Sequence, residues 1–171
     1  MRVGIVSAGA MGSAVGRTLL DGGAEVVTTL EGRSERTARL AEAAGLACVP
    51  TLGDVVDDVD VVLSIGPPGE AEKIAAAIAE ACNAAGAAPL VADLNAISPA
   101  TARKVESSLA GAGLDLVDGS ISGPPPTKAG TTRIYLSGTR ADEVAALPFR
   151  GVDLIEVGDD VGTASAVKMS T

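Results

Sequence analysis

Short runs rich in β-branched residues alternate along this chain with longer alanine-rich stretches, and this alternation most constrains the fold. Strands are predicted at residues 2–6, 25–30, 46–49, 60–65, 89–94, 114–119, 131–138 and 153–158, and helices at 10–23, 34–45, 69–83, 98–113, 142–148 and from 163 onward. Such alternation is typical of a mostly parallel sheet with helices on both faces and right-handed crossovers. We therefore expect an α/β fold of the Rossmann type, with a doubly wound sheet.

Composition narrows the class of protein. The chain has 171 residues, a net charge of −9 and no histidine, and its two cysteines, Cys48 and Cys82, stand far apart. These features argue against a zinc site, a metal centre of other kinds and a disulfide framework. The negative charge argues against nucleic acid as a partner, because neutralising phosphates requires Lys and Arg. No apolar run is long enough for a membrane span and no leader peptide is visible, so we expect a cytoplasmic protein.

A glycine-containing loop follows the first predicted strand. It reads SAGAMG, with Ser7 where the G-x-G-x-x-G pattern of dinucleotide-binding loops has its first glycine. Gly9 and Gly12 keep the other two positions, which allow backbone approach to a pyrophosphate and close packing of helix on strand. We expect a serine to fit the turn if its φ stays negative, and we expect Ser7, Gly9, Ala10, Met11 and Gly12 to bind a cofactor. The alternative is a strand-to-helix turn whose small residues serve packing alone.

The end of the second strand bears on which dinucleotide binds. Glu31 stands near the position of the carboxylate that holds the ribose 2′-hydroxyl of NAD. Arg33 and Ser34 follow it at the start of a helix, where a guanidinium and N–H donors suit a 2′-phosphate. We expect NADP rather than NAD. The alternative is that Ser34 only caps its helix and Arg33 is a solvated charge.

Several further segments carry a family resemblance that covers nearly the whole chain in order. They read GAMG, DLNAISPATA at 93–102, DGSISG at 118–123, GTTRIYLSG at 130–138 and GTASAVKMS at 162–170. The chain resembles the β-hydroxyacid dehydrogenases, which include 6-phosphogluconate and 3-hydroxyisobutyrate dehydrogenases. It is most similar to a poorly characterised branch of NADP-binding proteins that are like 6-phosphogluconate dehydrogenase.

The resemblance implies a division of the chain. Residues 1–160 would form the dinucleotide-binding domain, and residues 161–171 would begin a helix that leads to a C-terminal helical domain absent from this chain. In the family that helical half completes the substrate pocket and usually the dimer. A homodimer formed through it is therefore expected.

The resemblance also implies roles for individual residues. Lys168 would be the catalytic general acid or base, and Ser122 and Gly123 would contact a small-molecule substrate. Asn95 would lie near the nicotinamide ribose, and the loop over the cofactor would be formed by Ser64, Ile65, Gly66 and Pro67. Pro124 departs from the family's Ser-Gly-Gly pattern and removes one backbone N–H donor toward an anionic substrate.

Three functions remain open from these residues. The first is an NADP-dependent oxidoreductase that moves a hydride to or from a small hydroxy acid or carbonyl. The second is an imine reductase of the same architecture, and the third is an NADP-binding domain without catalysis. Lys168 and the SISG segment favour an enzyme, because a domain that only binds the cofactor needs neither. An ordinary surface lysine is the alternative for Lys168.

Overall fold

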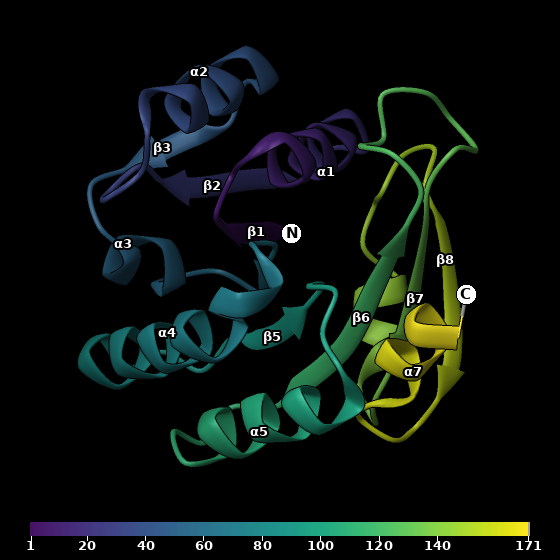
Figure 1. The fold of residues 1–171 in the computed structure, drawn as a ribbon. Helices are drawn as coiled ribbons and strands as arrows, with labels where there is room; N and C mark the ends of the chain where they lie inside the picture. Colours follow the sequence, from purple (N-terminus) through teal and green to yellow (C-terminus); the bar gives the residue numbers. More distant parts are fainter. Residues whose placement is uncertain (171) are drawn as a thin grey trace.

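The centre of the molecule is one sheet, seen in a computed structural model that describes residues 1–170 (Figure 1). Among these residues eight strands pair in the order β3-β2-β1-β4-β5-β6-β7-β8. Their bounds are β1 Arg2–Val6, β2 Glu25–Thr29, β3 Ala47–Val49, β4 Val61–Ser64, β5 Leu90–Asp93, β6 Leu116–Ser122, β7 Arg133–Ser137 and β8 Asp153–Gly158. The first six strands are parallel and follow the doubly wound order 3-2-1-4-5-6.

Helices cover both faces of the sheet, as the sequence predicts (Figure 1). On one face lie α1 Ala10–Asp21, α2 Glu35–Ala44 and α6 Ala141–Ala145. On the other lie α3 Leu52–Val56, α4 Ala71–Ala85, α5 Pro99–Ala110 and α7 Thr163–Ser170. Aliphatic side chains fill both cores, since Phe149 is the only aromatic residue in them among the described residues. The Rossmann-type fold is confirmed.

Two short helical segments add to the expected elements, and one strand pair is antiparallel within the mostly parallel sheet. α3 was not predicted, although Thr51 and Asp54 form a reciprocal capping box at its start. The 3-10 turn η1, Pro68–Glu70, which precedes α4, was not predicted either. β7 runs antiparallel to β6, because residues 123–132 reverse the chain without a helical crossover.

The turn from β1 into α1 is tight, and it corrects the expectation for Ser7. Ser7 has a φ of +73°, in the left-handed region, rather than the negative φ expected. A Cβ at Gly12 would lie 2.4 Å from the Ser7 carbonyl oxygen, so only glycine fits there. The Ser13 hydroxyl donates to the Ala8 carbonyl at 2.6 Å and ties helix to loop. The turn therefore brings the N-terminus of α1 directly to the carboxyl end of β1.

The backbone of Ser7 predicts the effect of restoring the usual glycine. A left-handed conformation costs a non-glycine residue roughly 1–2 kcal/mol in the folded state. A glycine avoids this cost, but it also gives the unfolded chain more conformational entropy, which cancels part of the gain. We expect Ser7→Gly to raise the free energy of unfolding by about 0.5–1 kcal/mol in urea titrations. The matched control is Ser98→Gly, at a φ of −74°, which removes the cap of α5 and should lower it. A lower stability for Ser7→Gly would contradict this account of the turn.

No helix within residues 1–170 is long and apolar enough to cross a membrane. The same residues contain no group of three or more His, Cys, Asp or Glu side chains arranged to hold a metal ion. Residence in the cytoplasm stays a prediction.

Candidate functional site

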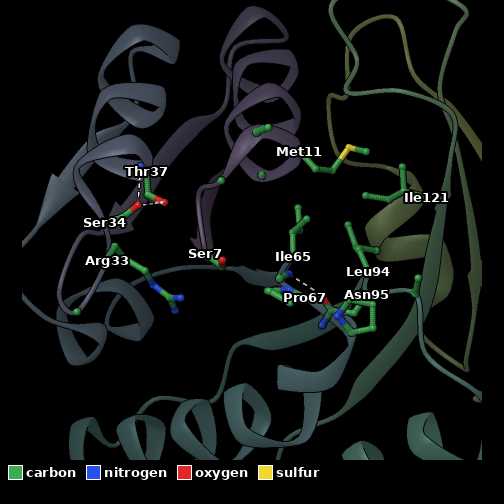
Figure 2. A pocket seen from close by; sticks show the side chains of 17 residues that line it. Ser7, Met11, Arg33, Ser34, Thr37, Ile65, Pro67, Leu94, Asn95 and Ile121 are labelled. Atoms are coloured by element: carbon green, nitrogen blue, oxygen red, sulfur yellow. Dashed lines mark hydrogen bonds between the residues drawn. The ribbon is translucent and has the colours of Figure 1, made fainter.

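A cavity of about 540 Å³ lies at the carboxyl ends of β1, β4 and β5, where the strand order reverses (Figure 2). Its volume lies within the range of small-molecule and cofactor sites, and open α/β sheets bind ligands at this position. The lining residues are Ser7, Gly9, Ala10, Met11, Gly12, Gly32, Arg33, Ser34, Thr37, Ile65, Gly66, Pro67, Pro68, Leu94, Asn95, Ala96 and Ile121. Eleven of them were predicted to bind the cofactor.

The N-terminus of α1 faces this cavity with its N–H groups available. No side chain among the described residues caps α1, whereas Ser34 caps α2 and Ser98 caps α5. The first N–H groups of a helix have no partner within the helix, and together with the helix dipole they favour an anion. The first turn of α1 is thus suited to bind phosphate.

Gly9 and Gly12 have different structural roles. Gly12 is required by the fold, because a side chain would collide with the Ser7 carbonyl. A Cβ at Gly9 would meet nothing within 4 Å, and its φ of −68° is open to any residue. No contact within the described protein therefore requires a glycine at position 9. The space that its Cβ would occupy belongs to the cavity, which fits a pyrophosphate close to the backbone.

The start of α2 forms the other end of the cavity. Figure 2 shows the Arg33 side chain extending into the space below Ser34 and Thr37. No carboxylate among residues 1–170 pairs with Arg33. Ser34 also caps α2, since its hydroxyl accepts the Thr37 N–H at 3.2 Å. Glu31 lies elsewhere, in a second cavity beside α3 and α4.

Asn95 joins the two loops beneath the cavity. Its side-chain oxygen accepts the Gly66 N–H at 2.5 Å, and its amide nitrogen donates to the Ser64 hydroxyl at 3.2 Å. Asn95 is also buried, so its amide holds the loop after β4 against the loop after β5 (Figure 2). Ile65 and Pro67 then stand as apolar walls of the cavity.

Four predicted site residues do not line the cavity. Ser64 is buried beneath it, and Lys168 is half-buried on α7. Ser122 ends β6 next to Ile121, which does line the cavity. Gly123 has a φ of +110°, and a Cβ there would lie 2.4 Å from the Thr131 carbonyl oxygen, so the fold itself requires this glycine.

Six lining residues were not predicted from the sequence: Gly32, Thr37, Pro68, Leu94, Ala96 and Ile121. Thr37 carries a usable signal, because it stands three residues after the capping serine and therefore in the first turn of α2. Leu94, Ala96 and Ile121 carry none, since apolar residues that end strands are common in any core.

Two buried carboxyl groups lie beneath the site on neighbouring strands. Asp93 on β5 and Asp118 on β6 are register partners and are 1% and 0% exposed. Burial raises the pKa of both groups, and it raises the pKa of Asp93 to about 6. Asp118 accepts three hydrogen bonds, whereas Oδ2 of Asp93 has no partner among the described residues. The pair therefore favours the charge on Asp118 and the proton on Asp93.

The raised pKa of Asp93 gives a pH-dependent stability. Its pKa of about 6 exceeds the ordinary 3.8, so the folded protein holds this proton more tightly than the unfolded chain. Stability from this group is complete below about pH 4 and is lost as pH rises through about 6. We expect Asp93→Asn to gain about 3 kcal/mol relative to the parent between about pH 4 and about pH 7.5 in urea unfolding.

The control for that prediction is Asp142→Asn, which removes an exposed carboxylate on α6. Its stability should follow the parent's pH profile. Parallel profiles for Asp93→Asn and the parent would show that the proton is not held at Asp93.

A doubly wound α/β domain with an uncapped helix N-terminus at its strand reversal belongs to the dinucleotide-binding class. Residues 2–149 match the family model described as the NAD binding domain of 6-phosphogluconate dehydrogenase. The chain belongs to this family, and the expected resemblance to the β-hydroxyacid dehydrogenases is confirmed.

Similar proteins extend beyond the length of this chain. An uncharacterised 28.5 kDa protein of Methanothermus fervidus is 28% identical over 169 residues, which are 99% of this chain and 63% of that protein. A conserved protein of unknown function, whose structure is described as similar to 3-hydroxyacid dehydrogenases, is 32% identical with a TM-score of 0.87, over 99% of this chain and 62% of its own. The chain thus spans less than two thirds of these relatives.

More distant structures share the fold. The 3-hydroxyisobutyrate dehydrogenase of Mycobacterium tuberculosis is 23% identical with a TM-score of 0.83, over 99% of this chain and 58% of its own. An imine reductase of Myxococcus stipitatus in complex with NADP+ is 24% identical with a TM-score of 0.78, over 99% of this chain and 59% of its own.

Proposed function

We propose that this chain is the NADP(H)-binding part of an oxidoreductase that acts on a small hydroxy acid or a related carbonyl compound. One observation carries the proposal: a single cavity joins the uncapped N-terminus of α1 to the unpaired guanidinium of Arg33. One end suits a pyrophosphate and the other suits a second phosphate. Among dinucleotides, NADP carries both a pyrophosphate and a separate 2′-phosphate, which two anion sites in one cavity would suit.

The choice of NADP over NAD is supported by the position of Glu31. A carboxylate for the ribose 2′-hydroxyl of NAD would have to line the same cavity as the α1 N-terminus. Glu31 lines the second cavity instead, while Arg33, Ser34 and Thr37 line the first. A 2′-phosphate would thus meet a cation and two hydroxyl groups rather than a like charge.

The remaining residues take roles that follow from their positions. Ser7, Gly9, Ala10, Met11 and Gly12 would surround the pyrophosphate, and Ile65, Gly66 and Pro67 would cover the cofactor. Asn95 would stand near the nicotinamide ribose and hold the two loops together.

Catalysis would depend on α7 and the end of β6. Bound NADP(H) supplies or accepts a hydride. Lys168 would take up or release the proton of the substrate, and Ser122 and Gly123 would contact the substrate. We propose that residues 1–160 form the dinucleotide-binding domain and that α7 leads into a helical domain through which a homodimer forms; the greater length of the relatives supports this. A panel of hydroxy acids and imines separates this proposal from its two alternatives. Turnover of imines would indicate an imine reductase, and binding of NADP(H) without turnover would indicate a domain that only binds the cofactor.

Gly9 provides the first test, because the fold leaves its Cβ position empty. We expect Gly9→Val to abolish binding of NADPH and NADH in calorimetric titrations while leaving the circular dichroism spectrum unchanged. The control is Gly53→Val, at a glycine of the second cavity whose Cβ would meet only the Thr51 hydroxyl at 3.5 Å. Normal binding by Gly9→Val would mean that the loop serves packing alone.

Arg33 provides the second test. A bidentate contact between a guanidinium and a phosphate is worth roughly 1.5–3 kcal/mol, which is about tenfold to a hundredfold in affinity. We expect NADPH to bind more tightly than NADH, and Arg33→Ala to lose most of that difference with the affinity for NADH unchanged. Arg36→Ala is the control, since Arg36 is exposed in the first turn of α2 and does not line the cavity. Equal affinities of the parent for the two cofactors would overturn the assignment of NADP.

A further inference from the structure

A row of buried polar side chains crosses four neighbouring strands on the face that carries α5 and α7. Ser64 pairs in register with Asp93, Asp93 with Asp118, and Asp118 with Ser137. All four residues are buried. Register partners on adjacent strands point to the same face, so these side chains form one continuous row. The row begins at the Asn95 contact under the cavity and ends under α7.

Asp118 meets the first turn of α7 at the end of this row. Its Oδ2 accepts the Gly162 N–H at 2.9 Å and the Ser165 N–H at 3.0 Å, and its Oδ1 accepts the Ser165 hydroxyl at 2.6 Å. A carboxylate at this point satisfies N–H groups that would otherwise lack partners and complements the helix dipole. Asp118 therefore does the work of a helix cap from a strand more than 40 residues away.

Two serines complete the attachment. The Ser120 hydroxyl donates to the Ala164 carbonyl at 2.8 Å, and the Ser137 hydroxyl accepts the Ala164 N–H at 2.9 Å. Both are buried, so water does not compete for these bonds. The sheet thus bonds the chain at Gly162, just before α7, and at Ala164 and Ser165 in its first turn.

We propose that Asp118 is a positioning residue, which fixes the first turn of α7 on β6 and thereby sets the position of Lys168. Lys168 follows Ser165 by three residues and lies on the same side of the helix. Helices in proteins gain most of their stability from tertiary packing, so the contacts of its first turn decide how α7 lies on the sheet. The inference rests on the proposed function in one respect, the role of Lys168 in proton transfer.

Amide hydrogen exchange of the whole chain, followed by NMR, tests the anchor without any substrate. We expect Asp118→Asn to speed exchange at Gly162 and Ser165 by about tenfold to a hundredfold, since an amide group replaces an acceptor of charge-assisted bonds. Exchange in β5 and β6 should change far less. The matched control is Asp93→Asn, at a buried carboxyl group in the same row that accepts the Asn95 N–H at 2.8 Å rather than a group of α7. This change should leave exchange in α7 as it is in the parent.

The second readout is the lysine itself. The chain is acylated with a small amine-reactive ester, and the modified lysines are identified by mass spectrometry. In the parent, Lys168 should be acylated more slowly than the exposed Lys104. In Asp118→Asn the two rates should approach each other, whereas in Asp93→Asn their ratio should stay as in the parent. A general loss of stability would instead raise amide exchange throughout the chain and change the acylation rates of all lysines alike.

Ser165→Ala keeps the test decisive if Asp118→Asn does not fold, because it removes only the hydroxyl donor and leaves the carboxylate. It should speed exchange of the same amides and expose Lys168, to a smaller extent. Unchanged exchange in α7, or a uniform rise across the sheet, would overturn the proposal. Failure of the parent to bind NADPH would instead overturn the proposed function and leave this result standing.

Discussion

The site depends on the contact between the Gly12 position and the Ser7 carbonyl oxygen. That contact lets α1 begin immediately after β1, and it requires both a glycine in the helix and a left-handed residue in the turn. Ser7 is strained in this conformation, and the turn that it forms directs the N–H groups of α1 toward an open cavity. A Cβ at Gly9 would meet nothing within the described protein, so packing does not require this glycine, whereas it does require Gly12.

The second structural principle is the buried polar row that extends from Ser64 to Ser137. Buried carboxyl groups are costly unless they are bonded or neutral; here Asp118 accepts three hydrogen bonds, and burial raises the pKa of its neighbour Asp93 to about 6. The row connects Asn95, which joins the loops under the cavity, to Asp118, which anchors α7. A purely apolar sheet would be more stable, but it would leave the first turn of α7 without partners. The polar row thus connects the loops under the cavity to α7 through neighbouring strands of the sheet.

Much of this could be predicted from sequence, for reasons that are local. The strand and helix periods, the glycine loop and the Arg33-Ser34 pair are all readable within a few residues of one another. The φ of Ser7 could not be predicted, because it depends on packing of α1 against β1. The row could not be predicted either, since Asp93 and Asp118 become neighbours only through the register of their strands. In the sequence, each looks like an ordinary acidic residue close to a loop. For the same reason the sequence does not show that the fold requires a glycine at Gly123, where a Cβ would meet the Thr131 carbonyl oxygen.

The central claim is that the N-terminus of α1 binds the phosphates of a dinucleotide. Titration of the isotopically labelled chain with NADPH, followed residue by residue in amide NMR spectra, tests it most directly. The account predicts saturable shifts that are largest at Ala10, Met11 and Gly12, with a second group at Arg33 and Ser34, and none around the second cavity at Thr51 and Asp54. Saturable binding without shifts at the start of α1, or shifts centred on the second cavity, would contradict it.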